Sequence, residues 1–475
     1  MTTIRLFKVM MLSLGLITLG SSVAPVRADY EVQYPTKDAW MGHHRALVIL
    51  LEWPNRPHQV SQAEVEKTFF GMGENDHSLR QYLLENSGGK FDITGTVLPW
   101  TKAKHNWGRL WCMFQEKLAD MSDHMSGCSP KTIVREAWAV AKDQIRISDY
   151  DSDGDGKIDH LFVVHSGKLW KPRGTPDDVF DYRFKQAQET EVFQSQGIGR
   201  IGTMIPIGFF LHESGHNLFG LGDYYGSGPG YEHGHYGIGM WGIMGLGAWG
   251  TSSSMPASEL FRYPAPYEAA SKIRIGWARA QVFTQSMRHV RLRPVEESAE
   301  VAVIPLGHYQ SSSYFLEYRA NRGFSRNQLG NGLLLWQGWD LIQADGRDDL
   351  NHGRNLKHRP LPPNKENFGD SSDPFPGSLN VTSYRDPKSG LVIEHIVQTP
   401  EYVDFDITFP NAALETESAA AIRPALKTES KSFLPVALNG HAWDFDLYPP
   451  RPHGLAPEGK TGSEQPWTKF EGLVR

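Results

Sequence analysis

The apolar positions of the chain divide it into two parts with different patterns. As far as about residue 280, short continuous apolar runs alternate with longer segments of helical spacing. The apolar runs predict strands over residues 46–51 and 161–164, and residues 91–97 predict a further strand. The other segments predict helices over residues 61–70, from a cap at Asp76 to Gly88-Gly89, and from Ser129-Pro130 onward. We therefore expect strands and helices to alternate in the first part of the chain.

After about residue 281 the pattern changes to short runs rich in β-branched and aromatic residues. They are separated by Gly, Pro, Asn and Ser and cover residues 301–304, 314–318, 333–336, 392–397 and 405–409. This pattern predicts a β-rich domain over residues 281–410, and we assign the chain to the α+β class. Beyond residue 410, Ala-, Glu- and Ser-rich sequence and then a Pro- and Gly-rich end predict a linker and a poorly ordered tail over residues 411–475.

The first 28 residues have the pattern of a secretory signal peptide. Arg5 and Lys8 form a basic start, residues 9–19 an apolar segment, and residues 26–28 a cleavage site. We expect a mature chain that begins near Asp29, has its first domain over residues 29–280, and is secreted to the periplasm or the medium. No other apolar stretch approaches a spanning length, so we expect no membrane span.

Composition limits the classes of function further. The 475 residues carry a net charge of -6, and 40% of them are hydrophobic, enough for a substantial core. The chain contains no basic block and no Lys/Arg cluster interleaved with aromatic residues, so we expect no nucleic-acid partner. We expect the chain to act as a monomer.

The segment from His212 to His216 reads His-Glu-x-x-His. Residues four apart on a helix lie on one face, so the two imidazoles can bind one metal ion. Two neutral imidazoles leave room for a third protein ligand and a water, an arrangement typical of zinc hydrolysis. Glu213 then serves as the general base that takes the proton of the water and passes it to the leaving amine.

The surroundings of this segment favour a metal over a chance match. Residues 205–211 are almost wholly apolar, as expected of a buried helix. Two His and a Glu on such a helix would be costly without a partner, and a metal ion is such a partner. Gly220 and Gly222 can end the helix and turn the chain back, which brings Asp223 toward the same ion.

A second metal-binding pattern lies between two predicted elements of the first part. Residues 151–159 read Asp-Ser-Asp-Gly-Asp-Gly-Lys-Ile-Asp, with carboxylates at positions 1, 3, 5 and 9 of a calcium loop, namely Asp151, Asp153, Asp155 and Asp159. Position 12 is Phe162 instead of Glu, and a strand follows, so the segment is not an EF-hand. We predict a shortened structural calcium site, the alternative being a solvated Asp-Gly turn.

The only cysteines, Cys112 and Cys128, lie in the part that would be exported. An oxidising compartment allows them to pair across a short loop, so we predict a disulfide. The alternative is a thiolate that blocks the zinc in a latent form, which requires an unpaired Cys in a pro-segment.

Several separated motifs resemble the immune inhibitor A family of secreted bacterial metalloproteases, from about residue 45 to about 410. They are residues 78–82 with 89–91, 151–166, 212–225, 241–245, 276–277, 314–319 with 332–336, and 373–377. The resemblance implies a zinc endopeptidase that acts on a protein or peptide substrate. It also implies a metzincin-like catalytic domain with a mixed sheet and an active-site helix, followed by β-rich sequence. It implies His212, His216 and Asp223 as zinc ligands, Glu213 as base, calcium in the catalytic domain, and Met244 below the metal in a methionine turn. The alternative for Met244 is an ordinary buried residue of a Gly-rich loop.

One departure from the family pattern affects the third ligand. Three residues instead of the usual two separate His216 from the helix-ending glycine, and Asp223 is displaced by one position. An added residue rotates the residues after it by about 100° if the helix continues, but much less if the glycine end absorbs it. His233 and His235 are alternative ligands, and Glu259 would be the ligand in a gluzincin-type site. Two other functions stay open, a catalytically inactive exported binding protein on a protease fold and a hydrolase of another ester or amide.

Overall fold

A computed structural model describes the chain over residues 40–106, 130–152, 154, 156, 158–166, 194–198, 207–224, 237–250, 263–306, 313–347, 350 and 369–422. Several sequence predictions lie outside the described residues. They are the signal peptide over residues 1–28, the cysteines Cys112 and Cys128, the calcium-loop residues Asp153 and Asp155, and the alternative ligands His233, His235 and Glu259.

The first part of the chain is built on a five-stranded sheet of order β2-β1-β4-β5, with β3 paired to β1. Its strands are β1 (Gly42–Glu52), β2 (Phe91–Val97), β3 (Thr101–Lys102), β4 (His160–Ser166) and β5 (Gln194–Ile198). Every pairing in it is parallel, whereas the family resemblance implied a mixed sheet. Parallel neighbours need crossover connections, and helices α1 (Gln62–Phe70) and α2 (Leu79–Asn86) supply the one between β1 and β2.

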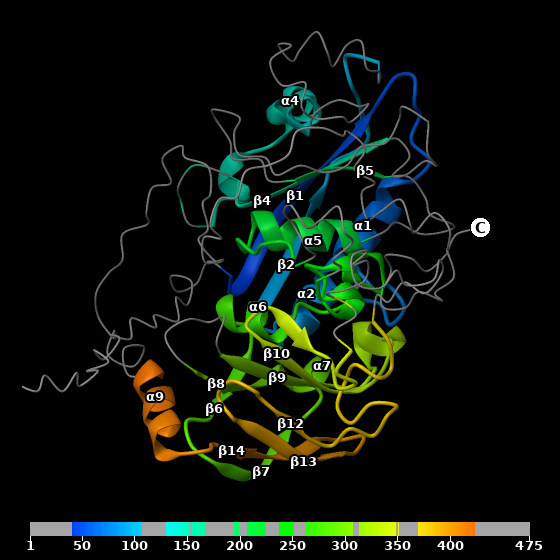
Figure 1. Ribbon diagram of the computed structural model, residues 1–475. Helices are drawn as coiled ribbons and strands as arrows, with labels where there is room; N and C mark the ends of the chain where they lie inside the picture. The colour runs from blue at the N-terminus through cyan, green and yellow to red at the C-terminus, as the bar shows by residue number, and fades with distance from the viewer. Residues whose placement is uncertain are drawn as a thin grey trace, which may run out of the picture.

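Helices cover both faces of this sheet (Figure 1). On β1, Ala46, Val48 and Leu50 pack toward α1, α2 and the helix that carries the His-Glu-x-x-His segment. The alternate residues of the strand pack toward helix α4 (Pro130–Ala141). The continuous apolar run over residues 46–51 is therefore the run of a strand buried on both faces, as the sequence predicted.

The N-cap of helix α2 lies two residues after the predicted cap, Asp76. Its N-cap is Ser78, whose hydroxyl accepts a hydrogen bond from the backbone N–H of Gln81, while the Gln81 side chain accepts from the backbone N–H of Ser78. Asp76 instead accepts from the backbone N–H of Gly73 and pairs with Lys67. The reciprocal capping box explains why the serine, and not the aspartate, starts the helix.

The second part of the chain contains two further sheets, of order β11-β10-β9-β8-β6 and β12-β13-β14-β7. Their strands are β6 (Arg279–Val282), β7 (Met287–Leu292), β8 (Glu300–Ile304), β9 (Tyr314–Arg319), β10 (Gly332–Gln337), β11 (Asp340–Ile342), β12 (Tyr384–Arg385), β13 (Val392–Gln398) and β14 (Val403–Thr408). All pairings in them are antiparallel except that of β6 with β8. The chain as described is thus a mixed α and β protein with a β-rich second part.

The five-stranded sheet of the second part is buried on both faces. Tyr314 and Leu316 of β9 pack against the four-stranded sheet. Phe315, between them, packs instead with Ile238 and Trp241 of the first part. The two parts therefore share a core, and β6, which spans the predicted boundary at residue 280, belongs to the sheet of the second part.

Short helical elements complete the described structure. They are η2 (Lys142–Gln144), η3 (Ile147–Asp149), α5 (Gly208–Asn217), η5 (Gly239–Trp241), η6 (Leu246–Trp249), α6 (Ala269–Arg274), α7 (Val295–Ser298), η9 (Gly323–Asn327) and α9 (Ala412–Ile422). Helix α9 begins where the sequence predicted a linker. Among the described residues, no helix is both long enough and apolar enough to cross a lipid bilayer.

Candidate metal centre

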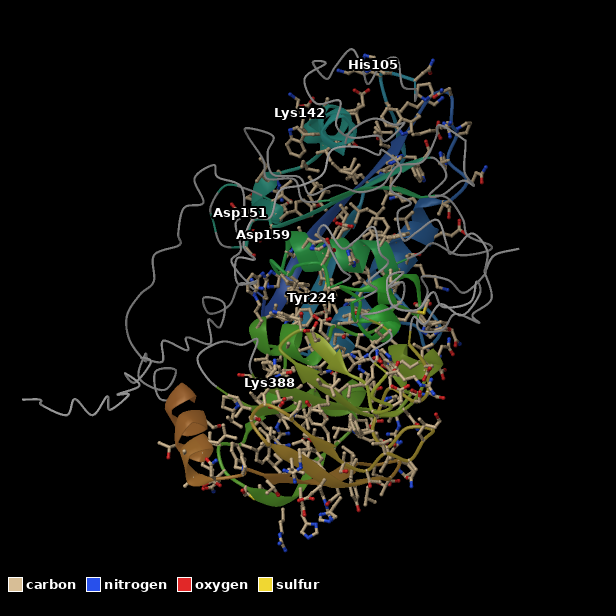
Figure 2. The ribbon with its side chains drawn as sticks, viewed as in Figure 1. His105, Lys142, Asp151, Asp159, Tyr224 and Lys388 are labelled. Atoms are coloured by element: carbon tan, nitrogen blue, oxygen red, sulfur yellow. The ribbon has the colours of Figure 1, made fainter. Side chains whose placement is uncertain are left out.

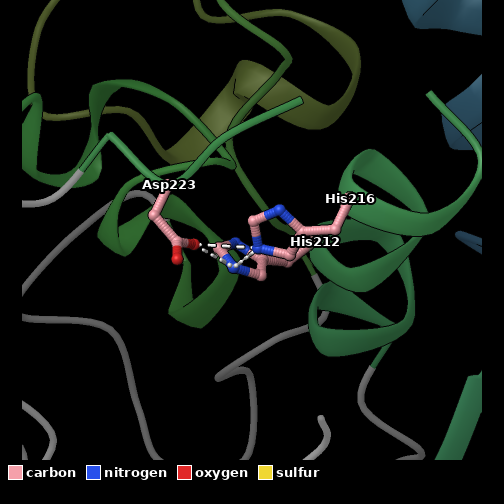
Figure 3. Close-up of side chains that lie close together, drawn as sticks. All are labelled: His212, His216 and Asp223. Atoms are coloured by element: carbon pink, nitrogen blue, oxygen red, sulfur yellow. Dashed lines mark hydrogen bonds and ion pairs between the residues drawn. The ribbon is translucent and has the colours of Figure 1, made fainter. Parts of the chain in front are cut away.

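Helix α5 carries the His-Glu-x-x-His segment and lies against the parallel sheet. Phe210 and Leu211 point into the core beneath the helix. His212 and His216 lie one turn apart on another face, and their Nε2 atoms are 3.1 Å apart (Figure 3). The spacing of the motif therefore brings the two imidazoles together as the sequence predicted.

Backbone carbonyls orient both rings. The Nδ1 atom of His212 lies 2.7 Å from the carbonyl oxygen of Ile243, and Nδ1 of His216 lies 2.8 Å from that of Leu221. A carbonyl oxygen can only accept, so each Nδ1 carries the hydrogen and donates it. Each Nε2 is then left with a lone pair, the form in which an imidazole binds a metal.

Asp223 reaches the two histidines in spite of the displaced position. Its Oδ1 lies 2.8 Å from Nε2 of His216 and 3.2 Å from Nε2 of His212. The end of α5 absorbs the additional residue, because the carbonyl oxygen of Ser214 accepts hydrogen bonds from both Leu218 and Phe219. Gly220, with φ of +63°, then turns the chain back toward the site.

The three side chains form a donor set that suits zinc. Two imidazole lone pairs and one carboxylate oxygen point at one place, and all three atoms are acceptors that repel one another without a positive charge between them. Ligand atoms on a tetrahedral zinc ion, at about 2.0–2.1 Å from it, lie about 3.3 Å from each other. The observed separations of 2.8–3.2 Å are close to that value.

The charges at the site are strongly coupled. Burial disfavours a charged His212, but the hydrogen bond to Asp223 and the negative charges of Glu213 and Asp223 raise the pKa of His212 to about 9. Burial also disfavours a charged Asp223, and the hydrogen bonds with both histidines outweigh it, so the pKa of Asp223 lies far below its usual range. Without a metal, a proton supplies the positive charge, and a metal ion would displace it.

Glu213, the predicted base, follows His212 on α5. Its side chain is half-buried, and its charge acts on His212 strongly enough to contribute to the raised pKa of that ring. The structure thus has a partly accessible carboxylate next to His212 in the chain.

Met244, the predicted methionine of a turn below the metal, is fully buried under α5. Its sulfur lies against Gly215, where an added Cβ would be 2.3 Å away. The carbonyl oxygen of Met244 accepts a hydrogen bond of 2.8 Å from the backbone N–H of Tyr224, next to Asp223. The turn over residues 238–247 therefore contacts the helix and the Asp223 segment at once.

Tyr224 packs away from the three ligand candidates. Its ring stacks on Trp339, with ring centroids 4.7 Å apart, and its hydroxyl lies 3.4 Å from Oγ of Ser271. In Figure 2 Tyr224 lies where the first part of the chain meets the β-rich part. This residue therefore takes part in the packing of the two parts.

The ends of the predicted calcium loop lie close together, as the labels Asp151 and Asp159 in Figure 2 show. The two carboxylate oxygens of Asp151 accept hydrogen bonds of 2.8 Å from the backbone N–H groups of Gly154 and Gly156. Asp159 accepts one of 2.7 Å from the backbone N–H of Ser152. The carboxylates of Asp151 and Asp159 thus close the loop by accepting hydrogen bonds from backbone N–H groups of its described residues.

The carbonyl groups that orient the histidines could not be found from sequence, because a backbone carbonyl carries no residue signal. The second group of carboxylates in the described structure, Asp345, Asp370 and Asp373, was also missed as a group. Only Asp373 stood in a noted motif, at residues 373–377. Its Oδ2 accepts a hydrogen bond of 2.7 Å from the indole N–H of Trp241.

A helix that presents two imidazoles, with a carboxylate from the following loop, is an arrangement found in metal-dependent hydrolases. Residues 61–278 match the sequence model of the immune inhibitor A peptidase M6 catalytic domain. Residues 61–278 are thus similar to the catalytic domain of that peptidase family, and the resemblance indicated by the motifs is confirmed.

Known relatives are distant. The chain is 28% identical over 220 residues to "Pre-pro-metalloprotease PrtV" of Vibrio cholerae serotype O1 strains M66-2 and ATCC 39315, over 37% of this chain and 22% of each relative. It is 24% identical over 287 residues to "Immune inhibitor A" of Bacillus thuringiensis subsp. alesti, over 48% of this chain and 41% of the relative. The chain therefore spans less than half the length of these relatives. Family and relatives together support a metallopeptidase.

Proposed function

We propose that the chain is a secreted zinc-dependent endopeptidase. The observation that carries the proposal is the convergence of Nε2 of His212, Nε2 of His216 and Oδ1 of Asp223 within 2.8–3.2 Å of each other. The proposal also rests on the peptidase M6 match over residues 61–278. Export is supported by the signal-like pattern of residues 1–28.

In the proposed mechanism His212, His216 and Asp223 would hold the zinc ion. Bound zinc supplies Lewis acidity, which polarises the peptide carbonyl and lowers the pKa of water. Glu213 takes the proton of the attacking water and delivers it to the nitrogen of the departing amine. The carbonyls of Ile243 and Leu221 keep both imidazoles in the tautomer that this role needs.

We also propose a structural calcium site over residues 151–159 and a disulfide between Cys112 and Cys128. The closed loop between Asp151 and Asp159 supports the first, because a cation would relieve the repulsion of its carboxylates. The oxidising compartment expected of an exported chain supports the second. The calcium proposal is independent of the zinc site.

The main alternative is a catalytically inactive exported binding protein on the same fold. The displaced Asp223 was the sequence feature in its favour, since a lost third ligand would weaken zinc binding. The distances from Asp223 to both histidines remove that argument and support the enzyme. The other alternative, a hydrolase of an ester or a different amide, has no specific observation in its favour.

The test is to measure the zinc content of the purified chain together with its hydrolysis of casein. We expect one zinc per chain, casein cleavage that stops with 1,10-phenanthroline, and recovery when zinc is added back. A His216→Ala variant should lose both zinc and cleavage. Zinc binding without cleavage of casein or other unfolded proteins would favour the binding protein, and ester hydrolysis alone would favour the second alternative.

A further inference from the structure

Buried charged residues of β9 reach across to the turn below the metal centre. Successive side chains of a strand point to opposite faces, so Glu317 and Arg319 share the face of Phe315, which packs against the first part of the chain. Both are fully buried. Arg319 donates hydrogen bonds to Oε1 of Glu317, and its Nη1 donates one to the carbonyl oxygen of Trp241.

Trp241 is held from the β-rich part at its side chain as well. Its indole N–H donates a hydrogen bond of 2.7 Å to Oδ2 of Asp373, and the residue is 1% exposed. The β-rich part therefore contacts the main chain of Trp241 through Arg319 and its side chain through Asp373. Two directional bonds to one buried residue fix both its position and its orientation.

The turn over residues 238–247, which contains Trp241, supports two of the ligand candidates. Two residues later, the carbonyl of Ile243 orients His212. The next residue, Met244, contacts α5 at Gly215 and accepts the backbone N–H of Tyr224 beside Asp223. A shift of Trp241 would therefore move the carbonyl of Ile243, which orients His212. It would also move Met244, whose carbonyl holds the backbone next to Asp223.

Apolar side chains could also have filled the buried positions of Glu317 and Arg319. A buried ion pair usually gives no more stability than well-packed apolar residues of similar size, because desolvating the charges is costly. Stability alone therefore does not explain why Glu317 and Arg319 are charged. The forked guanidinium of Arg319 provides one, because it bonds to Glu317 and to the Trp241 carbonyl at once.

We propose that Arg319 and Asp373 are positioning residues for the metal centre, acting through Trp241. On this view the β-rich part is a structural component of the centre and not an appended binding module. The inference deepens the proposed function and rests on it for the role of the ligands. The contacts through Trp241 can be tested without it.

The test compares Arg319→Lys with Lys272→Met. A lysine keeps the charge next to Glu317, but its single ammonium cannot span Glu317 and the Trp241 carbonyl in the same way. Lys272 is the matched control, because it is equally buried and its Nζ lies 3.2 Å from Oε2 of Glu317, but no bond joins it to Trp241 among the described residues. Both variants disturb the same buried charges, and only one alters the contact to the turn.

The first measurement is hydrogen exchange in the metal-free chain, made at an equal interval below the melting temperature of each variant. The informative amides are those of Tyr224, Ile243 and Gly245, which donate to Met244, Pro266 and Gly242. Arg319→Lys should speed their exchange about tenfold, and Lys272→Met should leave it unchanged. If Arg319→Lys does not fold, Trp241→Phe, which removes the indole N–H, should speed the same amides.

The second measurement is the zinc dissociation constant, with the absorption spectrum of the cobalt-substituted protein as a signature of ligand geometry. Direct outer-shell partners change metal affinity by about 10- to 100-fold, so this contact, one step further away, should change it by about three- to tenfold. Equal exchange and equal affinity in Arg319→Lys and Lys272→Met would overturn the inference. A native chain that binds no zinc would instead contradict the proposed function, and the exchange result would still decide the role of Arg319.

Discussion

Gly215 of helix α5 lies directly against the sulfur of Met244. A Cβ atom on residue 215 would be 2.3 Å from that sulfur and 3.2 Å from the ring of Tyr267. A glycine inside a helix costs about 1 kcal/mol relative to alanine, so its use here needs a reason. The reason is the close approach of the turn to the helix between the two histidines.

Replacing Gly215 with alanine should therefore destabilise the chain, although alanine is the better helix former. Overpacking of a core costs about 1–3 kcal/mol, which exceeds the gain in helix propensity. We expect a lower melting temperature and weaker zinc binding, measured by thermal unfolding and by competition with a chromophoric chelator.

Met244→Ala provides the control for this prediction, because it removes the atom that the new methyl group would meet. In that background Gly215→Ala should be close to neutral, which a double-mutant cycle would show as a coupling free energy. Additive effects of the two substitutions would mean that the contact does not limit the approach of the turn.

The role of Glu213 can be separated from metal binding by Glu213→Gln. The amide keeps the size of the side chain but cannot take a proton, so we expect unchanged zinc content and a fall in kcat for peptide hydrolysis of about 10²- to 10⁴-fold. Glu74→Gln, which removes an exposed carboxylate elsewhere in the first part, controls for the change in charge. Full activity of Glu213→Gln would rule out the proposed mechanism.

The calcium loop is tested by replacing Asp153 and Asp155 with asparagine. If residues 151–159 bind calcium, the double variant should melt at a lower temperature than the native chain in the presence of calcium and at the same temperature with a chelator. Asp149→Asn is the matched control, because Asp149 lies just outside the loop and pairs with Arg146. The loop is a simple turn if calcium changes none of the melting temperatures.

Much of the fold could be predicted from hydrophobic patterning, and the errors have physical causes. The strand of residues 46–51 is a continuous apolar run, which is typical of a strand buried on both faces. Strand β5 over Gln194–Ile198 was missed, because three of its five residues are Gln or Ser and only pairing with β4 makes it a strand. The shared core of the two parts was missed as well, because the short run of residues 314–318 predicts a strand but does not say what each of its faces packs against.

The candidate site was more predictable than the fold around it. The imidazoles of His212 and His216 meet because helix geometry alone fixes their relation. The placement of Asp223 depended on how the end of α5 accommodates one additional residue. The double hydrogen bond to the Ser214 carbonyl decides this, and nothing in the residue types around it distinguishes that outcome from a continued helix.

The pH dependence of stability should depend on Glu85, at the contact between α2 and η9. Burial raises the pKa of Glu85 to about 8, and the nearby Glu296 adds to this effect, although the carboxylate accepts a hydrogen bond of 3.0 Å from the backbone N–H of Phe324. Its ordinary value, expected in the unfolded chain, is 4.5. The folded state therefore binds the proton more tightly than the unfolded state.

The sign of the effect is set by this difference. The stabilisation from protonated Glu85 is complete below about pH 4.5 and is lost as the pH rises to about 8. Glu85→Gln cannot ionise, so it should equal the native chain near pH 5 and be more stable near pH 9, by on the order of 2 kcal/mol after allowance for partial exposure. Urea unfolding of both chains across this range measures the difference, and Glu66→Gln on the exposed face of α1 controls for net charge. A difference that does not change with pH would mean that Glu85 is ionised in the folded chain throughout the range.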